Sequence, residues 1–197
     1  MSNFTRICAI LLIIIFAIGI GFGTDWVWDT VDEKSHPQLY HESVTRYSVA
    51  YNVPEYLIFA VIKTESDFDP SAESSAKARG LMQMIESTFL ELTGPEYLNE
   101  NLAFDALYDP DVSIRYGTYY LKYLYEMFNY DWDTALAAYN GGLGNVRKWL
   151  KDPECTDENG KLTYIPFSET RSYVSKVNRA MDMYQKLYYQ PNEGVSA

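Results

Sequence analysis

Cysteine and histidine are scarce in this chain, with two residues of each among 197. Cys8 precedes a long apolar run and Cys155 lies far after it, so we expect no disulfide framework. Stability must then come from a hydrophobic core. His36 and His41 stand alone, five residues apart, so we expect no metal site, and nothing in the chain indicates a cofactor.

Positive charge is also in short supply. The chain carries 16 basic against 27 acidic residues, a formal net charge of −11. So acidic a chain argues against nucleic acid as a partner. It is compatible with a neutral or zwitterionic glycan, which aromatic faces and hydrogen bonds recognise, and aromatic residues make up 16% of the chain. Most of the 18 tyrosines can equally be explained by ordinary helix packing.

One long hydrophobic run is present, from residue 7 to 22, with Arg6 directly before it. A helix needs about 20 apolar residues to span a bilayer, so this run is short for an anchor and suits the core of a signal peptide. Gly21 and Gly23 are small residues near a cleavage point. We therefore predict a signal peptide or membrane anchor over 1–23, and membrane attachment through 7–22 remains an alternative. Residues from 24 onward are expected outside the cytoplasm.

The remaining chain shows helical periodicity and almost no strand alternation, which predicts an all-α fold. We predict a leader over 24–40, a single domain over 41–190 and a tail over 191–197. The length and hydrophobic content allow one substantial core. About seven helices are expected, over 41–51, 54–66, 77–92, 111–128, 132–139, 144–150 and 169–189.

One carboxyl stands at the end of an apolar helical stripe. Leu57, Ile58, Val61, Ile62 and Glu65 share one face of the helix expected over 54–66. Burial there, and the negative end of the helix dipole, would raise the pKa of Glu65, as a general acid working near neutral pH requires. Spacing alone favours a plainer interpretation, in which Glu65 forms a buried salt bridge or turns to solvent.

Glu65 belongs to the first of four sequence motifs. They are Glu65-Ser66 with Phe68, Pro70 and Ala72; Ala78-Arg79-Gly80-Leu81-Met82-Gln83; Ala137-Ala138-Tyr139-Asn140-Gly141-Gly142; and Ile165-Pro166 with Glu169-Thr170-Arg171-Ser172-Tyr173-Val174. In this order and spacing the chain resembles the SLT-type lytic transglycosylases, relatives of goose-type lysozyme, from about residue 41 to 180. The resemblance implies a lysozyme-like α-rich fold with a substrate groove.

The resemblance also implies roles for particular side chains. Glu65 would be the catalytic acid and base, and Ser74, Gln83 and Tyr139 would contact the glycan or the catalytic carboxyl. Asn140 follows Tyr139 just before a glycine pair, so both would be presented at a chain reversal.

Each of these positions also has a structural interpretation. Ser74 could cap a turn, and Gln83 could be a helix-surface residue. The family commonly has Met-Pro where Ile85 and Glu86 stand here, so a methionine contact with substrate passes to Met84, which could instead simply pack.

Most glycosidases use two carboxylates, and the candidates for a second one here are Asp67, Asp69, Glu73, Glu86 and Glu169. None has a comparably apolar setting. We interpret Glu169 as a structural tie near Arg171 and Glu86 as a solvated helix residue.

The family chemistry needs only one acid, because the substrate's acetamido group and C6 hydroxyl act as nucleophiles and leave a 1,6-anhydromuramoyl end. The implied partner is the glycan strand of peptidoglycan, and cell-wall or secretion machinery are further partners to test. A lysozyme-like hydrolase and an inactive glycan-binding or assembly protein are the rival functions.

Overall fold

The structure is a computed structural model and describes residues 32–189. The chain divides into two compact units, and the described residues 32–37 belong to one and 38–189 to the other. Between residues 38 and 189 the chain is α-helical, and its only β-type pairings are isolated bridges. The predicted all-α class is confirmed. The predicted export segment, 1–23, and the tail, 191–197, lie outside the described residues.

The described helices follow the predicted order closely. From residue 38 onward they are α2 (His41–Tyr51), α3 (Glu55–Ser66), α4 (Glu86–Leu92), the 3-10 helix η1 (Phe104–Tyr108), α5 (Pro110–Met127), α6 (Trp132–Gly141), α7 (Leu143–Trp149) and α8 (Ser168–Tyr188). Residues 32–35 are also helical. The prediction of a helix over 77–92 is wrong for residues 77–85, and η1 was not predicted.

Residues 77–85 form a folded loop because several of them adopt a left-handed backbone. Lys77, Gly80 and Gln83 have φ values of 62°, 75° and 47°, which a continuous α-helix excludes. Arg79 instead exchanges backbone hydrogen bonds with Met84, at 3.0 and 3.2 Å. The helix therefore starts only at Glu86, in α4.

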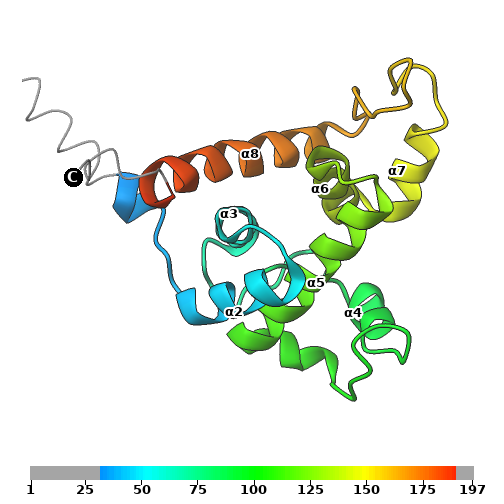
Figure 1. The fold of residues 1–197 in the computed structure, drawn as a ribbon. Helices are drawn as coiled ribbons and strands as arrows, with labels where there is room; N and C mark the ends of the chain where they lie inside the picture. The colour runs from blue at the N-terminus through cyan, green and yellow to red at the C-terminus, as the bar shows by residue number, and fades with distance from the viewer. Residues whose placement is uncertain (1–31, 190–197) are drawn as a thin grey trace, which may run out of the picture. The chain divides into compact units, whose positions relative to one another are not determined.

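Helix α3 is the central element of this unit. It packs against α8 and α2, and Figure 1 shows it nearly end-on between them. The six consecutive residues 57–62 are all buried, so α3 is apolar on every side rather than along one stripe as predicted. Glu65, near its C-terminal end, is thereby carried out of the core and into the wall of a cavity.

The longest helices fix the position of α6. Helix α5 packs against α2, α6 and η1, and α6 also contacts α7 and α8. The Asp109 side chain caps α5 by accepting from the backbone N–H groups of Asp111 and Val112, and Pro110 occupies the first turn. Helix α6 ends at Gly141, and Gly142 reverses the chain with a φ of 86°. The predicted stop at the glycine pair is confirmed.

Between residues 32 and 189 no helix is both long enough and apolar enough to cross a membrane. The apolar run over 7–22, on which the anchor prediction depends, is outside that range.

Candidate active site

A cavity of about 320 Å³ opens beside the end of α3. It lies against the 74–85 loop, the first turn of α4, α5 and the end of α6. All six residues selected from the sequence line it, namely Glu65, Ser74, Gln83, Met84, Tyr139 and Asn140. Residues 74–88, α5, the end of α6 and the first turn of α8 thus meet beside the Glu65 carboxyl. The cavity is within the size range typical of small-ligand sites.

The loop that forms one wall is held by backbone contacts at close range. The Ser66 hydroxyl donates to the Leu81 carbonyl at 2.8 Å, and the Ser113 hydroxyl accepts from the Met82 N–H at 3.1 Å. A Cβ atom on Gly80 would lie 2.0 Å from the Leu107 carbonyl oxygen. Only glycine can therefore occupy this position, because both its positive φ and its contact with η1 exclude a side chain.

An ionic cluster fixes the outer side of the same loop. The Arg79 guanidinium donates to Glu73 at 3.0 Å and to Asp105 at 2.5 Å, and it lies over the Phe104 ring. Hydrogen bonds from Lys77, Tyr108 and Arg79 lower the pKa of Glu73 to about 2. Glu73 is therefore a constitutively charged structural residue and not a proton donor.

Glu65 keeps part of its surface open to the cavity, while its carboxyl is largely surrounded by protein. Burial raises the pKa of this carboxyl to about 7, and a hydrogen-bonding interaction with the Tyr173 hydroxyl opposes part of the rise. Desolvation is the dominant cause, as expected for a carboxyl among apolar side chains. Glu65 thus exchanges a proton near neutral pH, which is the property that a general acid and base needs.

Two tyrosines face this carboxyl, of which Tyr173 is buried and Tyr139 half-buried. The Tyr139 hydroxyl donates to the Met82 carbonyl at 2.8 Å, and burial together with the charge of Glu65 raises its pKa well above the usual value. Burial likewise raises the pKa of Tyr173, again with Glu65 as the main charged neighbour. Within residues 32–189 the Tyr173 hydroxyl forms no hydrogen bond of normal length and angle. Its interaction with the Glu65 carboxyl is therefore mainly electrostatic. Both tyrosines stay neutral while Glu65 titrates.

Gln83 is not on a helix surface, which excludes its structural interpretation from the sequence. Its amide nitrogen donates to the Ala72 and Gly80 carbonyls at 3.0 and 2.9 Å. Both partners are acceptors, so the orientation of the amide is fixed. Both N–H groups are used by the backbone, and only the amide oxygen remains for a ligand, which limits Gln83 to accepting.

The other three predicted contact residues differ in how much of the side chain is available to a ligand. The Ser74 hydroxyl accepts from the Ala78 N–H at 3.1 Å, so Ser74 closes a turn as well as lining the cavity. Met84 is 4% exposed and packs with Phe89, so core packing accounts for most of its surface. Asn140 is exposed at the cavity rim.

Of the five candidates for a second carboxylate, four lie outside the lining of the cavity. Asp67 pairs with Lys63, Asp69 caps a turn at Ser71, Glu73 belongs to the ionic cluster, and Glu86 is exposed in the first turn of α4. Glu169 is different, because it lines the cavity.

The interpretation of Glu169 as a structural tie is wrong. Within the described residues it forms no ion pair, and Arg171 instead donates to the Ile165 carbonyl and lies over the Tyr164 ring. The side chain of Glu169 is exposed to solvent. A second carboxylate therefore stands at the rim of the cavity.

Sequence reasoning missed Tyr120 and gave no role to Tyr173. Tyr173 lies four residues after Glu169 on α8, so helical spacing was an available signal. Tyr120 lines the cavity and packs against Tyr139 with the two rings tilted by 46° and their centroids 5.5 Å apart. Nothing in the sequence around Tyr120 distinguishes it from the other tyrosines of α5.

Known proteins of one family are similar to this chain. Residues 42–160 match the model of the transglycosylase SLT domain. The soluble lytic murein transglycosylase of Escherichia coli K12 is 33% identical over 82% of this chain and 25% of its own length, and that of Salmonella typhimurium is 32% identical over 86% and 26%. The chain thus spans about a quarter of the curated relatives that it matches.

Solved structures give the same result. The crystal structure of the 70 kDa soluble lytic transglycosylase from Escherichia coli is similar with a TM-score of 0.71 and 32% identity, over 79% of this chain and 25% of that one. An inactive mutant of the lytic transglycosylase Slt from Pseudomonas aeruginosa is similar with a TM-score of 0.70 and 33% identity, over 82% and 26%. Since the family model covers more than half of its residues, the chain belongs to the transglycosylase SLT domain family.

Proposed function

We propose that this protein is a lytic transglycosylase that cleaves the MurNAc–GlcNAc β-1,4 bond of peptidoglycan, outside the cytoplasm. The observation that carries the proposal is Glu65, a carboxyl with a pKa of about 7 in a cavity beside Gln83 and Tyr139. The names of the relatives support the substrate, since they are murein transglycosylases. The solved Pseudomonas aeruginosa relative, described as inactive, differs from its parent by one Glu→Gln change, which supports a glutamate as the essential group.

In the proposed reaction Glu65 acts twice. Its protonated carboxyl donates to the glycosidic oxygen while the C1–O bond breaks, and the 2-acetamido oxygen of the muramoyl residue bonds to C1. The Glu65 carboxylate then accepts the proton of the C6 hydroxyl, whose oxygen replaces the acetamido oxygen at C1. Glu65 ends protonated again, and the product is a 1,6-anhydromuramoyl end. A pKa near 7 suits both half-reactions.

Glu169 gives a specific reason to keep a second candidate, a lysozyme-like hydrolase. A carboxylate at the cavity rim can orient a water molecule against C1. We favour the transglycosylase, because Glu169 lies in solvent, where a carboxylate interacts only weakly with a distant reacting centre.

Mass spectrometry of the products of purified peptidoglycan separates the two reactions. We expect anhydro ends from the first cut, lighter than reducing ends by the mass of one water. Reducing ends alone would overturn the transglycosylase assignment. The Glu169→Gln variant is the matched control, because it should keep the anhydro product if water plays no part.

The pH dependence of the rate follows from Glu65. The free enzyme must hold the proton, so kcat/KM should fall about tenfold per pH unit once the pH exceeds the pKa of about 7. Initial rates of muropeptide release between about pH 5 and 9 test this. A flat profile on the alkaline side would contradict the assignment of Glu65 as the acid.

A further inference from the structure

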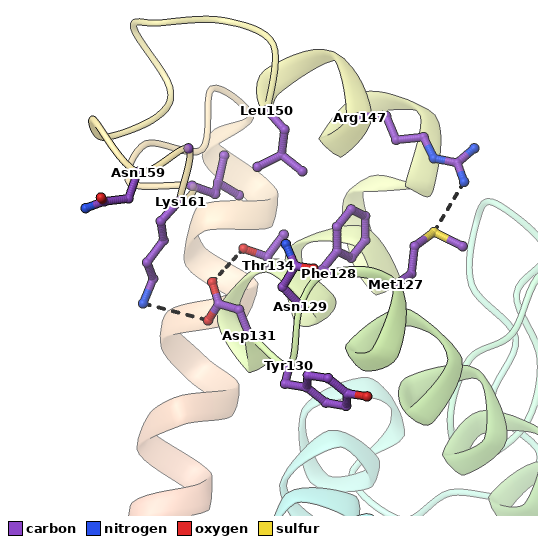
Figure 2. A pocket seen from close by; sticks show the side chains of 12 residues that line it. Met127, Phe128, Asn129, Tyr130, Asp131, Thr134, Arg147, Leu150, Asn159 and Lys161 are labelled. Carbon is purple, nitrogen blue, oxygen red and sulfur yellow. Dashed lines mark hydrogen bonds and ion pairs between the residues drawn. The ribbon is translucent and has the colours of Figure 1, made fainter.

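A second cavity, of about 580 Å³, lies where α5 ends and α6 begins. Figure 2 shows it beneath α7 and the turn that carries Asn159 and Lys161. It shares no lining residue with the cavity around Glu65. It lies at the opposite end of α6, since Asp131 lines one cavity and Asn140 the other. At 1.5 Å per residue these two positions are about 14 Å apart along the helix.

The lining combines an apolar floor with polar groups at the rim. Phe128 and Leu162 are largely buried beneath it, whereas Asn129 and Asn159 are exposed and carry amides. An amide side chain can both donate to and accept from a peptide bond. The cavity therefore offers contacts for small alkyl groups and for backbone amides.

Two basic side chains at the rim of the cavity have only weak partners within the described residues. The Arg147 guanidinium donates to the sulfur of Met127 at 3.3 Å, a weak acceptor, and forms no ion pair with another described residue. Lys161 lies 3.9 Å from Asp131, which is the outer limit of an ion pair, and Asp131 also accepts from the Thr134 hydroxyl at 2.8 Å. Figure 2 shows Arg147 and Lys161 on opposite sides of the hollow. Two basic groups with such weak partners can form charge-assisted hydrogen bonds with an anion.

The backbone around the cavity is strained on one side and firmly held on the other. Asn129 and Tyr130 are consecutive left-handed residues, with φ of 53° and 63°, and the Tyr130 ring is 68% exposed. Such conformations cost about 1 kcal/mol or more each and gather at ligand sites. Opposite them, the Asp157 side chain accepts from the N–H groups of Asn159 and Lys161, both at 2.9 Å. The turn that carries these side chains is thus fixed in advance.

We propose that this second cavity binds a peptide with free carboxylates, of the kind that peptidoglycan carries as its stem. The inference deepens the proposed function and depends on it for the source of the peptide. The guanidinium of Arg147 and the ammonium of Lys161 bind the carboxylates of the peptide. The amides of Asn129 and Asn159 form hydrogen bonds with its peptide groups, and the apolar floor contacts its alanine methyl groups.

The experiment measures binding to the full chain bearing Glu65→Gln, so that no glycan is cut. The probes are the stem tetrapeptide L-Ala-γ-D-Glu-L-Lys-D-Ala, the same peptide with both carboxylates amidated, and inorganic phosphate. Amide chemical shifts and calorimetry report the site and the Kd. We expect the free tetrapeptide to shift the amides of residues 159–162, and amidation to weaken binding about tenfold, as loss of charge-assisted bonds does.

Variants then test the two cations. Arg147→Gln with Lys161→Gln should weaken tetrapeptide binding about tenfold. The matched control, Lys176→Gln with Arg179→Gln, removes the same two residue types from the exposed surface of α8 and should leave binding unchanged. Equal binding by both double variants, or equal binding of the free and amidated peptides, overturns the proposal. So does phosphate that competes fully for the site, which would assign it to a phosphorylated ligand.

Failure of the peptide-binding proposal can be distinguished from failure of the proposed function. Binding is measured without turnover, and the comparison of free with amidated peptide needs no variant that could misfold. Cleavage of peptide-free glycan by the unmodified chain tests Glu65 alone. If that cleavage occurs and the tetrapeptide does not bind, only the second cavity has been misassigned.

Discussion

Replacing Glu65 by glutamine should lower the rate of glycan cleavage at least about 10³-fold, because the variant can neither donate nor accept the proton in either half-reaction. The amide keeps the shape of the side chain, so the cavity and its affinity for glycan should persist. Release of soluble muropeptides from purified peptidoglycan measures the rate, and co-sedimentation with the insoluble wall measures binding.

The matched control for this variant is Glu126→Gln. Glu126 forms a surface pair with Lys122 at 2.8 Å on α5, so its replacement should change stability by less than about 1 kcal/mol and leave the rate unaltered. Unchanged wall digestion by the Glu65 variant would reject the catalytic assignment. An unmodified protein that binds the wall without cutting it would instead favour the rival function of a glycan-binding or assembly protein.

Gly80→Ala should destabilise the fold by about 3 kcal/mol or more, through its left-handed φ and the clash of the new methyl group with the Leu107 carbonyl. For a chain of this size that corresponds to a fall in Tm of roughly 6–12 °C, measurable by thermal unfolding. Activity should fall as well, because the Gly80 carbonyl accepts one of the hydrogen bonds that orient Gln83.

Gly160→Ala isolates the steric part of that effect. Gly160 has nearly the same φ, 74°, but no atom lies within 4 Å of an added methyl group. Its replacement should therefore cost only the backbone preference, about 1 kcal/mol. If the two variants unfold at the same temperature, the contact between Gly80 and η1 is not what restricts this position.

Local sequence signals were sufficient to predict helix boundaries that depend on residues next to them in the chain. The helices expected over 111–128 and 132–139 agree with α5 and α6 to within about two residues, because Asp109 caps the start of α5 and Gly142 reverses the chain after α6. The segment 77–85 was mistaken for a helix because most of its residues tolerate one. Its actual shape depends on Ser113 and on η1, which lie about thirty residues further along the chain.

The site was predictable as a set of residues but not as a geometry. The blocks of sequence indicated Glu65, Gln83 and Tyr139, and the structure brings them to one cavity. The orientation of the Gln83 amide and the position of Glu169 were not accessible, because both depend on long-range packing. Helix α8 covers α3 from a hundred residues away, and its first turn carries Glu169 to the rim of the cavity.

The buried carboxyl of Glu65 also has a consequence for the folded state as a whole. Its pKa is about 7 in the folded chain against an ordinary value of 4.5, so the folded state binds this proton more tightly than the unfolded chain does. Stability from this group is therefore complete below about pH 4.5 and declines as the pH rises, by up to about 3 kcal/mol once the pH exceeds 7. The rest of the core must offset that loss, so the fold is least stable, as far as this group is concerned, at the pH where Glu65 is fully ionised.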